Sequence, residues 1–172
     1  MFLKILPYFI FLLVKKIEDS VQSIQLLTRT FDGFVGSSQV YENSAGMKSG
    51  TITIRVPADR FEETMAAIKN LAVKIEREDV NAQDVTEKFI DLEARLRNLE
   101  AQEIQYLEIM KRAFTVNDIL QVQQRLGDAR GQIEQIQGQI QFLSRQVDMS
   151  TITVSLISEA DIEVFGISWR PL

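Results

Sequence analysis

The second half of the chain carries an unbroken run of apolar residues spaced alternately three and four positions apart. The run spans four heptads and consists of Ile119, Val122, Leu126, Ala129, Ile133, Ile136, Ile140, Leu143 and Val147. This spacing places every member on one stripe of an α-helix, and a stripe of this length is typical of a coiled-coil seam. Because such a stripe must be covered to be stable, the sequence predicts a long helix paired with another helix.

The covering helix is predicted directly upstream, over residues 84–113. Its apolar positions are Phe89, Leu92, Leu96, Leu99, Tyr106 and Met110. Glu103 interrupts their spacing, which otherwise matches that of the second helix. Asp84 stands three residues before Glu87, which is the arrangement of an N-cap residue and its capping-box partner. The upstream segment therefore has both a start signal and a face that can cover the seam.

A short break at Phe114 and Thr115 separates the two predicted helices. Thr115 can cap the second helix, and Asp118, three residues later, can return the hydrogen bond. Because a short connection makes two long helices antiparallel neighbours, residues 84–147 are predicted to form an antiparallel coiled-coil hairpin. At 1.5 Å per residue, about 30 residues in each arm give a length of roughly 45 Å.

The first 83 residues alternate strand and helix signals. In order, the predicted elements are a strand at 8–14, a helix at 17–31 closed by Gly33, a β-hairpin of strands 34–41 and 51–56, a helix from Pro57 to about residue 72, and a strand at 73–80. This βαββαβ order is that of ferredoxin-like folds, in which two helices pack on one face of a four-stranded antiparallel sheet. An alternating strand at 150–157 is predicted to rejoin that sheet.

The predicted fold class is therefore α+β: a ferredoxin-like antiparallel sheet with an inserted coiled-coil helical hairpin and a final returning strand. We expect residues 1–83 and 148–160 to form the sheet domain, residues 84–147 to form the hairpin, and residues 161–172 to form a tail. The tail contains the lone tryptophan, Trp169, which we interpret as a packing or linker residue.

The first 14 residues are apolar and resemble a short signal peptide with Lys4 as its basic residue. They are too few to span a bilayer, which takes about 20 apolar residues. Lys15 and Lys16 follow where a small-residue cleavage site would be expected, and there is no Cys to accept a lipid. We favour a buried strand at residues 8–14 over a signal peptide.

The chain contains no His and no Cys, which excludes thiol chemistry, disulfides, zinc sites with N or S ligands and every His-dependent general base. Its net charge of −5 argues against a nucleic-acid partner, because such proteins usually present a basic face. The acidic residues are placed on helix surfaces and not as a pair in a cleft. We therefore predict a protein that is not an enzyme and has no cofactor.

One cluster of carboxylates could in principle hold Ca²⁺ or Mg²⁺ through oxygen ligands. It consists of Asp79, Asp84, Glu87, Asp91 and Glu93. The spacing matches no calcium loop, and acidic residues are expected near a helix N-terminus for capping and for the helix dipole. We favour this structural interpretation and predict no metal site. A divalent-cation or small-ligand sensor that uses the carboxylates near Asp84 is the alternative function.

The connection between the helices, Phe114, Thr115 and Val116, is the candidate interaction tip. It carries two apolar residues where no core is expected to reach them. A contact site is one interpretation, and packing of Phe114 across the turn is the other; the sequence favours neither.

The second helix also carries a glutamine-rich face, which could bind another helix but is more often a wet surface. Its members are Gln121, Gln123, Gln124, Gln132, Gln135, Gln137, Gln139 and Gln141. Gly127, Gly131 and Gly138 in the same helix each cost about 1 kcal/mol relative to Ala. They suggest the close approach of another backbone, either from the hairpin partner or from a second subunit.

Several segments together resemble the domain of unknown function 4349 family, whose members are described as lipoprotein-like proteins of the cell envelope. They are D-G-F-V at 32–35, I-T-I-R-V-P-A-D-R-F at 52–61, E-D-V-N-A-Q-D-V-T-E-K-F-I-D-L-E-A-R-L-R-N-L at 78–99, T-V-N-D-I-L at 115–120, S-T-I-T-V at 150–154 and a late W-R-P. The resemblance covers residues 8–171, and the run from D-V-T to D-L-E-A-R-L is its specific part.

The resemblance implies an α+β domain with an inserted helical hairpin, located outside the cytoplasmic membrane but attached to it. It supplies no catalytic residues, and this chain lacks the lipid-attachment cysteine. We therefore expect a non-enzymatic structural or interaction module of the cell envelope. Its expected partner is another protein or a second copy, bound through the hairpin, and association with a membrane is expected from the resemblance alone.

Overall fold

The computed structural model describes residues 3–158 of the 172-residue chain. The described chain is a mixed α+β protein with four α-helices, a five-stranded sheet and a two-stranded sheet. It divides into two compact units, one of residues 3–4 and 84–146 and one of residues 5–83 and 147–158. The predicted tail, including Trp169, lies outside the described residues.

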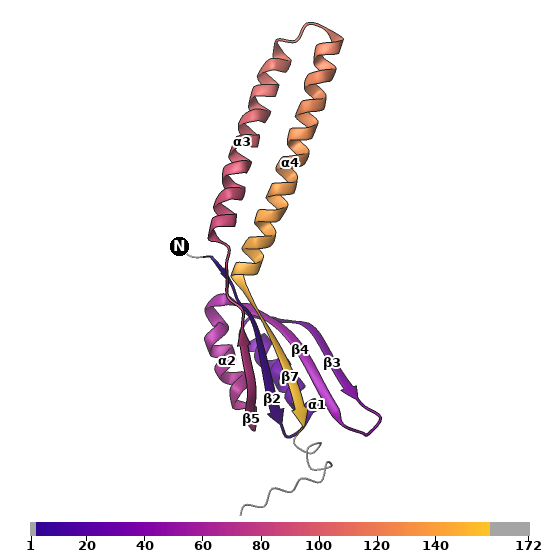
Figure 1. Cartoon of the computed structure of the whole chain (residues 1–172), viewed down its shortest axis with the longest axis vertical. Helices are drawn as coiled ribbons and strands as arrows, with labels where there is room; N and C mark the ends of the chain where they lie inside the picture. The colour runs from indigo at the N-terminus through magenta and orange to yellow at the C-terminus, as the bar shows by residue number, and fades with distance from the viewer. Residues whose placement is uncertain (1–2, 159–172) are drawn as a thin grey trace, which may run out of the picture. The chain divides into compact units, whose positions relative to one another are not determined.

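The sheet strands closely follow the predicted segments. They are β2 (Pro7–Val14), β3 (Phe34–Glu42), β4 (Lys48–Pro57), β5 (Lys74–Val80) and β7 (Met149–Ser158). Their spatial order is β3-β4-β7-β2-β5 (Figure 1). Two short strands, β1 (Lys4–Ile5) and β6 (Gln83–Asp84), form the two-stranded sheet and were not predicted, because two residues are too few to show a period.

The predicted antiparallel sheet is wrong in one pairing, because β7 runs parallel to β2 and antiparallel to β4. β7 lies between these two strands, which a ferredoxin-like sheet would place side by side. Its inward residues Ile152, Val154 and Leu156 are at most 1% exposed, as expected of a strand that is paired on both sides. The sheet is therefore mixed, with the last strand of the chain at its centre.

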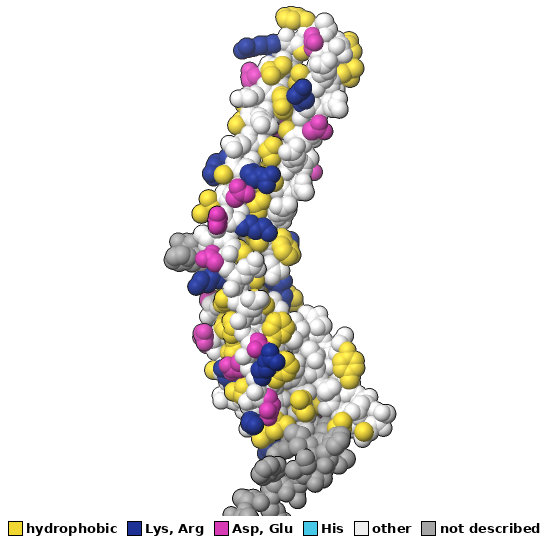
Figure 2. Space-filling model, in the orientation of Figure 1, with side chains coloured by type: hydrophobic (Ala, Val, Ile, Leu, Met, Phe, Trp, Pro, Cys, Tyr) yellow, Lys and Arg dark blue, Asp and Glu magenta, His cyan; other side chains and the backbone are white. Residues whose placement is uncertain are grey.

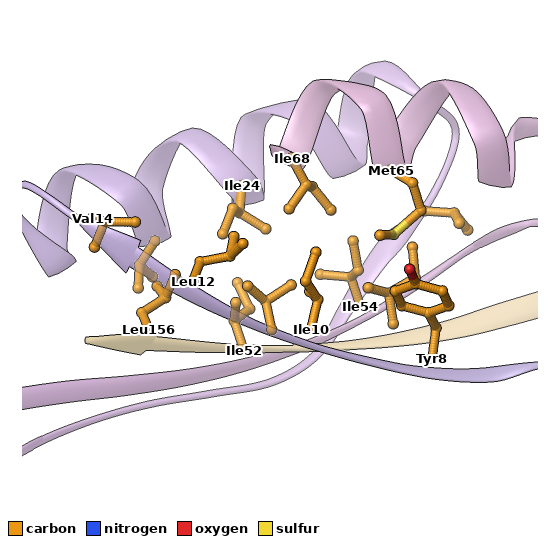
Figure 3. Packing of buried hydrophobic residues seen from close by; sticks show 14 of the residues in the cluster. Tyr8, Ile10, Leu12, Val14, Ile24, Ile52, Ile54, Met65, Ile68 and Leu156 are labelled. Atoms are coloured by element: carbon orange, nitrogen blue, oxygen red, sulfur yellow. The ribbon is translucent and has the colours of Figure 1, made fainter. Parts of the chain in front are cut away.

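Helices α1 (Ile17–Thr30) and α2 (Phe61–Asn70) cover one face of this sheet (Figure 1). Their buried faces follow the predicted spacing of three and four residues. Figure 3 shows Ile24 and Ile68 of the helices pointing toward Ile10 and Ile52 of the strands, and all four are fully buried. This single layer of aliphatic side chains is the hydrophobic core of the sheet unit.

The turn from α1 into β3 corrects one detail of the prediction. The left-handed residue is Asp32, with φ of 58°, and not Gly33. Gly33 is required for space instead, because a Cβ there would lie 2.5 Å from the carbonyl oxygen of Arg55 and 2.7 Å from Cγ1 of Val56. Its backbone N–H donates to the carbonyl of Thr28 at 2.8 Å, which ends the helix.

Tyr8 links the core to β5, which lies at the edge of the sheet. Its ring packs edge-on against Phe61 with centroids 5.5 Å apart, and its hydroxyl donates to Oε2 of Glu78 at 2.8 Å. Glu78 also forms an ion pair with Lys69 of α2, with Oε1 and Nζ 2.7 Å apart. Burial, together with the negative charge of Glu78, raises the pKa of Tyr8 to about 12.

We expect Ile152→Ala to lower the free energy of unfolding by about 2–5 kcal/mol, because it leaves a cavity beneath a fully buried central strand. Ile157→Ala is the matched control in the same strand, since this side chain is 43% exposed. Its cost should be about 1 kcal/mol or less. Urea unfolding of both variants measures the difference, and equal losses would show that β7 is not packed at the centre.

The raised pKa of Tyr8 predicts a loss of stability at alkaline pH. The unfolded chain releases the phenolic proton near pH 10, whereas the folded chain holds it to about 12, so this contribution is complete below about pH 10 and is lost as the pH rises to about 12. Tyr8→Phe keeps the ring and lacks the proton. The difference in unfolding free energy between the two proteins should therefore shrink between about pH 10 and about pH 12. An unchanged difference in urea titrations would contradict the assignment.

Candidate interaction surface at the turn end of the helix pair

Helices α3 (Thr86–Lys111) and α4 (Val116–Asp148) lie side by side and run in opposite directions (Figure 1). Glu103, the residue that interrupts the apolar spacing of α3, accepts a hydrogen bond from Nε of Arg130 on α4 at 2.6 Å. The ion pair accounts for a carboxylate in this position. Sequence reasoning identified the interruption but not its partner, because the two residues are 27 positions apart.

The seam of α4 is closed in its middle and more open toward the turn. Leu126, Ala129, Ile133, Ile136 and Leu143 are buried, each less than 9% exposed. Ile119 and Val122, nearer the turn, are only half-buried, as are the facing positions of α3 at this end of the pair. The two helices therefore leave apolar surface uncovered where α3 passes into α4.

Thr115 caps α4 as predicted, but the Asp118 carboxylate returns the bond to the Thr115 hydroxyl and not to its backbone N–H. The backbone N–H of Asp118 donates to Oγ1 of Thr115 at 3.1 Å, and Thr115 in turn donates to the Asp118 carboxylate at 2.5 Å. Phe114 is 97% exposed and Val116 is 74% exposed. Packing of Phe114 across the turn, one of the two interpretations of this segment, is therefore wrong, because the cap fixes the backbone with the aromatic ring in solvent.

Further exposed apolar residues surround this turn, and we call the whole set the turn-end surface. It consists of Ile104, Leu107, Ile109, Phe114, Val116 and Leu120. Figure 2 shows apolar side chains gathered over the end of the helix pair where α3 passes into α4. Single exposed apolar residues are ordinary on protein surfaces, and a group of them makes this end of the helix pair a candidate interaction site.

A groove of about 540 Å³ lies between the two helices beside the turn. Tyr106 and Ile109 of α3 and Val122 of α4 supply its apolar lining. Its charged lining consists of Arg112, Arg125 and Asp118, and neither arginine has an ion pair within residues 3–158. The groove can therefore accept an apolar side chain next to a carboxylate.

The candidate carboxylates do not assemble into a metal site in the part of the chain that the structure describes, where no group of three acidic side chains could hold an ion. The prediction that Asp84 is the N-cap of α3 is wrong, because Val85 occupies that position. The Asp84 carboxylate instead accepts the N–H of Thr86 at 2.9 Å, and hydrogen bonds with Thr86 lower its pKa. Asp79 is paired with Arg77 at 2.6 Å.

The glutamine-rich face of α4 is exposed to solvent. All eight glutamines of the predicted polar face are exposed. A Cβ added at Gly127, Gly131 or Gly138 would meet no atom within 4 Å. The expected close approach of a backbone is therefore not made by α3. The structure gives them no role within the chain.

Comparison with known proteins identifies one family. The model of Domain of unknown function (DUF4349) matches residues 10–164, which is most of the chain. No curated protein and no solved structure matches it. Among residues 3–158, none of the helices combines the length and apolarity needed to cross a membrane.

We expect Gly131→Ala to raise the free energy of unfolding by about 1 kcal/mol, because the helix gains propensity and the methyl group enters open space. The same substitution at Gly33 should lower it by about 1–3 kcal/mol, since the added Cβ would press on the backbone of Arg55. Thermal and urea unfolding of the two variants would test the opposite signs. A loss of stability at Gly131 would show that another chain occupies this face.

Proposed function

Since the chain belongs to the DUF4349 family, a domain of unknown function, we propose from its own surface that it is a non-enzymatic interaction module of the cell envelope. The module contacts another protein, or a second copy, through the turn-end surface. The observation that carries the proposal is the exposure of Phe114, at 97%, beside an apolar groove. Its placement in the envelope rests on the family resemblance alone.

The proposal treats α3 and α4 as an antiparallel coiled-coil hairpin. The alternating spacing of nine apolar positions in α4 supports it, as does the burial of Leu126 through Leu143 along that stripe. A stiff helix pair suits this role, because it holds Phe114 and Val116 at fixed positions that need no ordering when a partner binds.

We also propose that the sheet unit is a ferredoxin-like arrangement into which β7 has been inserted. Without β7, the remaining order is β3-β4-β2-β5, with neighbours running in opposite directions, as a ferredoxin-like sheet requires. In this arrangement the two ends of the helix pair connect to β6 and β7, so the pair is an insertion that leaves the order of the older strands unchanged.

The chemistry of the groove defines the partner. Its two arginines, Arg112 and Arg125, outnumber its one carboxylate, Asp118, so the groove favours carboxylates. Its apolar lining favours an apolar side chain. An acidic, amphipathic segment of another protein satisfies both requirements. No observation favours the alternative function, a cation sensor near Asp84, and we carry it no further as a proposal.

Site-specific photo-crosslinking in the source organism tests the proposal. A benzophenone amino acid in place of Phe114 should form one discrete covalent adduct, because this side chain would lie against the partner. The matched control is the same amino acid at Gln137, which is exposed on the same helix pair but lies outside the turn-end surface. An adduct of twice 19.7 kDa would identify a second copy, and any other mass would identify a different protein.

The Phe114→Ser, Val116→Ser double variant should lose the adducts that are formed from a second photo-reactive position at Leu120. The fold should be unaffected, because both substituted side chains are exposed. Absence of any adduct at 114, or equal yields at 114 and 137, would overturn the proposal.

A further inference from the structure

The two edges of the five-stranded sheet differ in charge. Edge strand β5 carries Lys74, Glu76, Arg77, Glu78 and Asp79 among its seven residues. Edge strand β3 has nine residues and a single charged one, Glu42, at its last position. Charged side chains are the usual means of preventing an edge strand from pairing with another chain. β5 therefore has this protection, and β3 does not.

We propose that β3 pairs antiparallel with β3 of a second copy of this chain, joining the two sheets edge to edge. β3 is bonded to β4 on one side and, within residues 3–158, has no strand on the other, so half of its backbone N–H and C=O groups remain available. In an antiparallel pair of identical strands, a two-fold axis relates the two copies. Each strand therefore donates and accepts the same backbone hydrogen bonds. The proposal does not depend on the turn-end surface.

The side chains of β3 match one register, in which Ser38 lies opposite Ser38 of the second copy. β3 has a bulge between Val35 and Ser37. Counted past the extra residue of this bulge, the register places Phe34 opposite Tyr41 of the second copy. The two-fold axis repeats the same pair at the other end of the strand. Phe34 and Tyr41 are 52% and 56% exposed in the single chain, on the sheet face away from the helices. Cross-strand aromatic pairs are among the stabilising contacts of antiparallel sheets.

Charges at the ends of the strand are also complementary. In this register Glu42 of one copy reaches the beginning of the other copy's β3, just after the end of α1. Arg29 lies in the last turn of that helix. Within residues 3–158 neither Glu42 nor Arg29 has an ion pair, so each is available to the other across the interface. The two-fold axis forms this pair twice and places no like charges directly opposite each other.

The chain contains no Cys, so one introduced thiol reports directly on the register. Ser38→Cys should give a disulfide-linked dimer under mild oxidation, because directly opposed residues of antiparallel strands have Cα atoms about 4.5–5.5 Å apart. Glu76→Cys is the matched control, because residue 76 is exposed on β5, the edge strand that carries charged side chains. We expect linkage at Ser38 to be at least about tenfold faster, because a held pair has a high effective concentration.

Light scattering across a range of concentrations gives an independent measurement. The wild-type chain should approach twice its 19.7 kDa mass as concentration rises. Ser38→Lys should remain a monomer, because two ammonium groups would face each other on the two-fold axis. Ser38→Thr should remain a dimer, and so should Phe114→Ser, which separates this interface from the turn-end surface. Equal linkage at residues 38 and 76, a monomeric wild type, or a dimer that tolerates Ser38→Lys would each overturn the proposal.

Discussion

The position of β7 is the constraint on which the rest of this fold depends. Its parallel pairing with β2 and antiparallel pairing with β4 place the last described strand of the chain in the middle of the five-stranded sheet. The core closes only when β7 has returned, because Val154 lies between Ile10 of β2 and Ile52 of β4. Ile152 lies in the same way between Tyr8 and Ile54. Everything between β5 and β7 must therefore leave the sheet and come back to it. The antiparallel helix pair meets this requirement, because its short turn directs α4 back alongside α3.

Local periodicity predicted nearly all of the elements, because the alternation of strands and the three-four spacing of helices are properties of neighbouring residues. The order of the strands was not predictable in the same way. The alternation of apolar and polar residues at 150–157 fits an edge strand as well as a central strand with one covered face. Only contacts with residues far apart in sequence decide which position the strand takes. Similarly, the ion pair of Glu103 with Arg130 could not be found from α3 alone.

The candidate site was predictable in position but not in exposure. The break at Phe114 and the cap at Thr115 mark the turn from sequence, and the hydrogen bonds of Thr115 and Asp118 confirm the cap. Whether Phe114 packs or projects depends on how closely α3 and α4 approach beside it. There the seam is only half-covered and a groove remains, and the aromatic ring projects into solvent beside this groove.

The same sheet shows how charge directs association. β5 is anchored to the core by Tyr8 and Glu78, and its alternating Lys, Glu and Arg residues pair among themselves, as in the contacts of Arg77 with Asp79. These ion pairs are exposed and contribute little to folding stability. Their larger effect is to make addition of another strand unfavourable at that edge, since a newcomer would have to desolvate them. β3 has no such barrier, because Ser37, Ser38 and Gln39 offer hydrogen bonds without charge. This contrast between the two edges is the reason why we propose strand addition at β3.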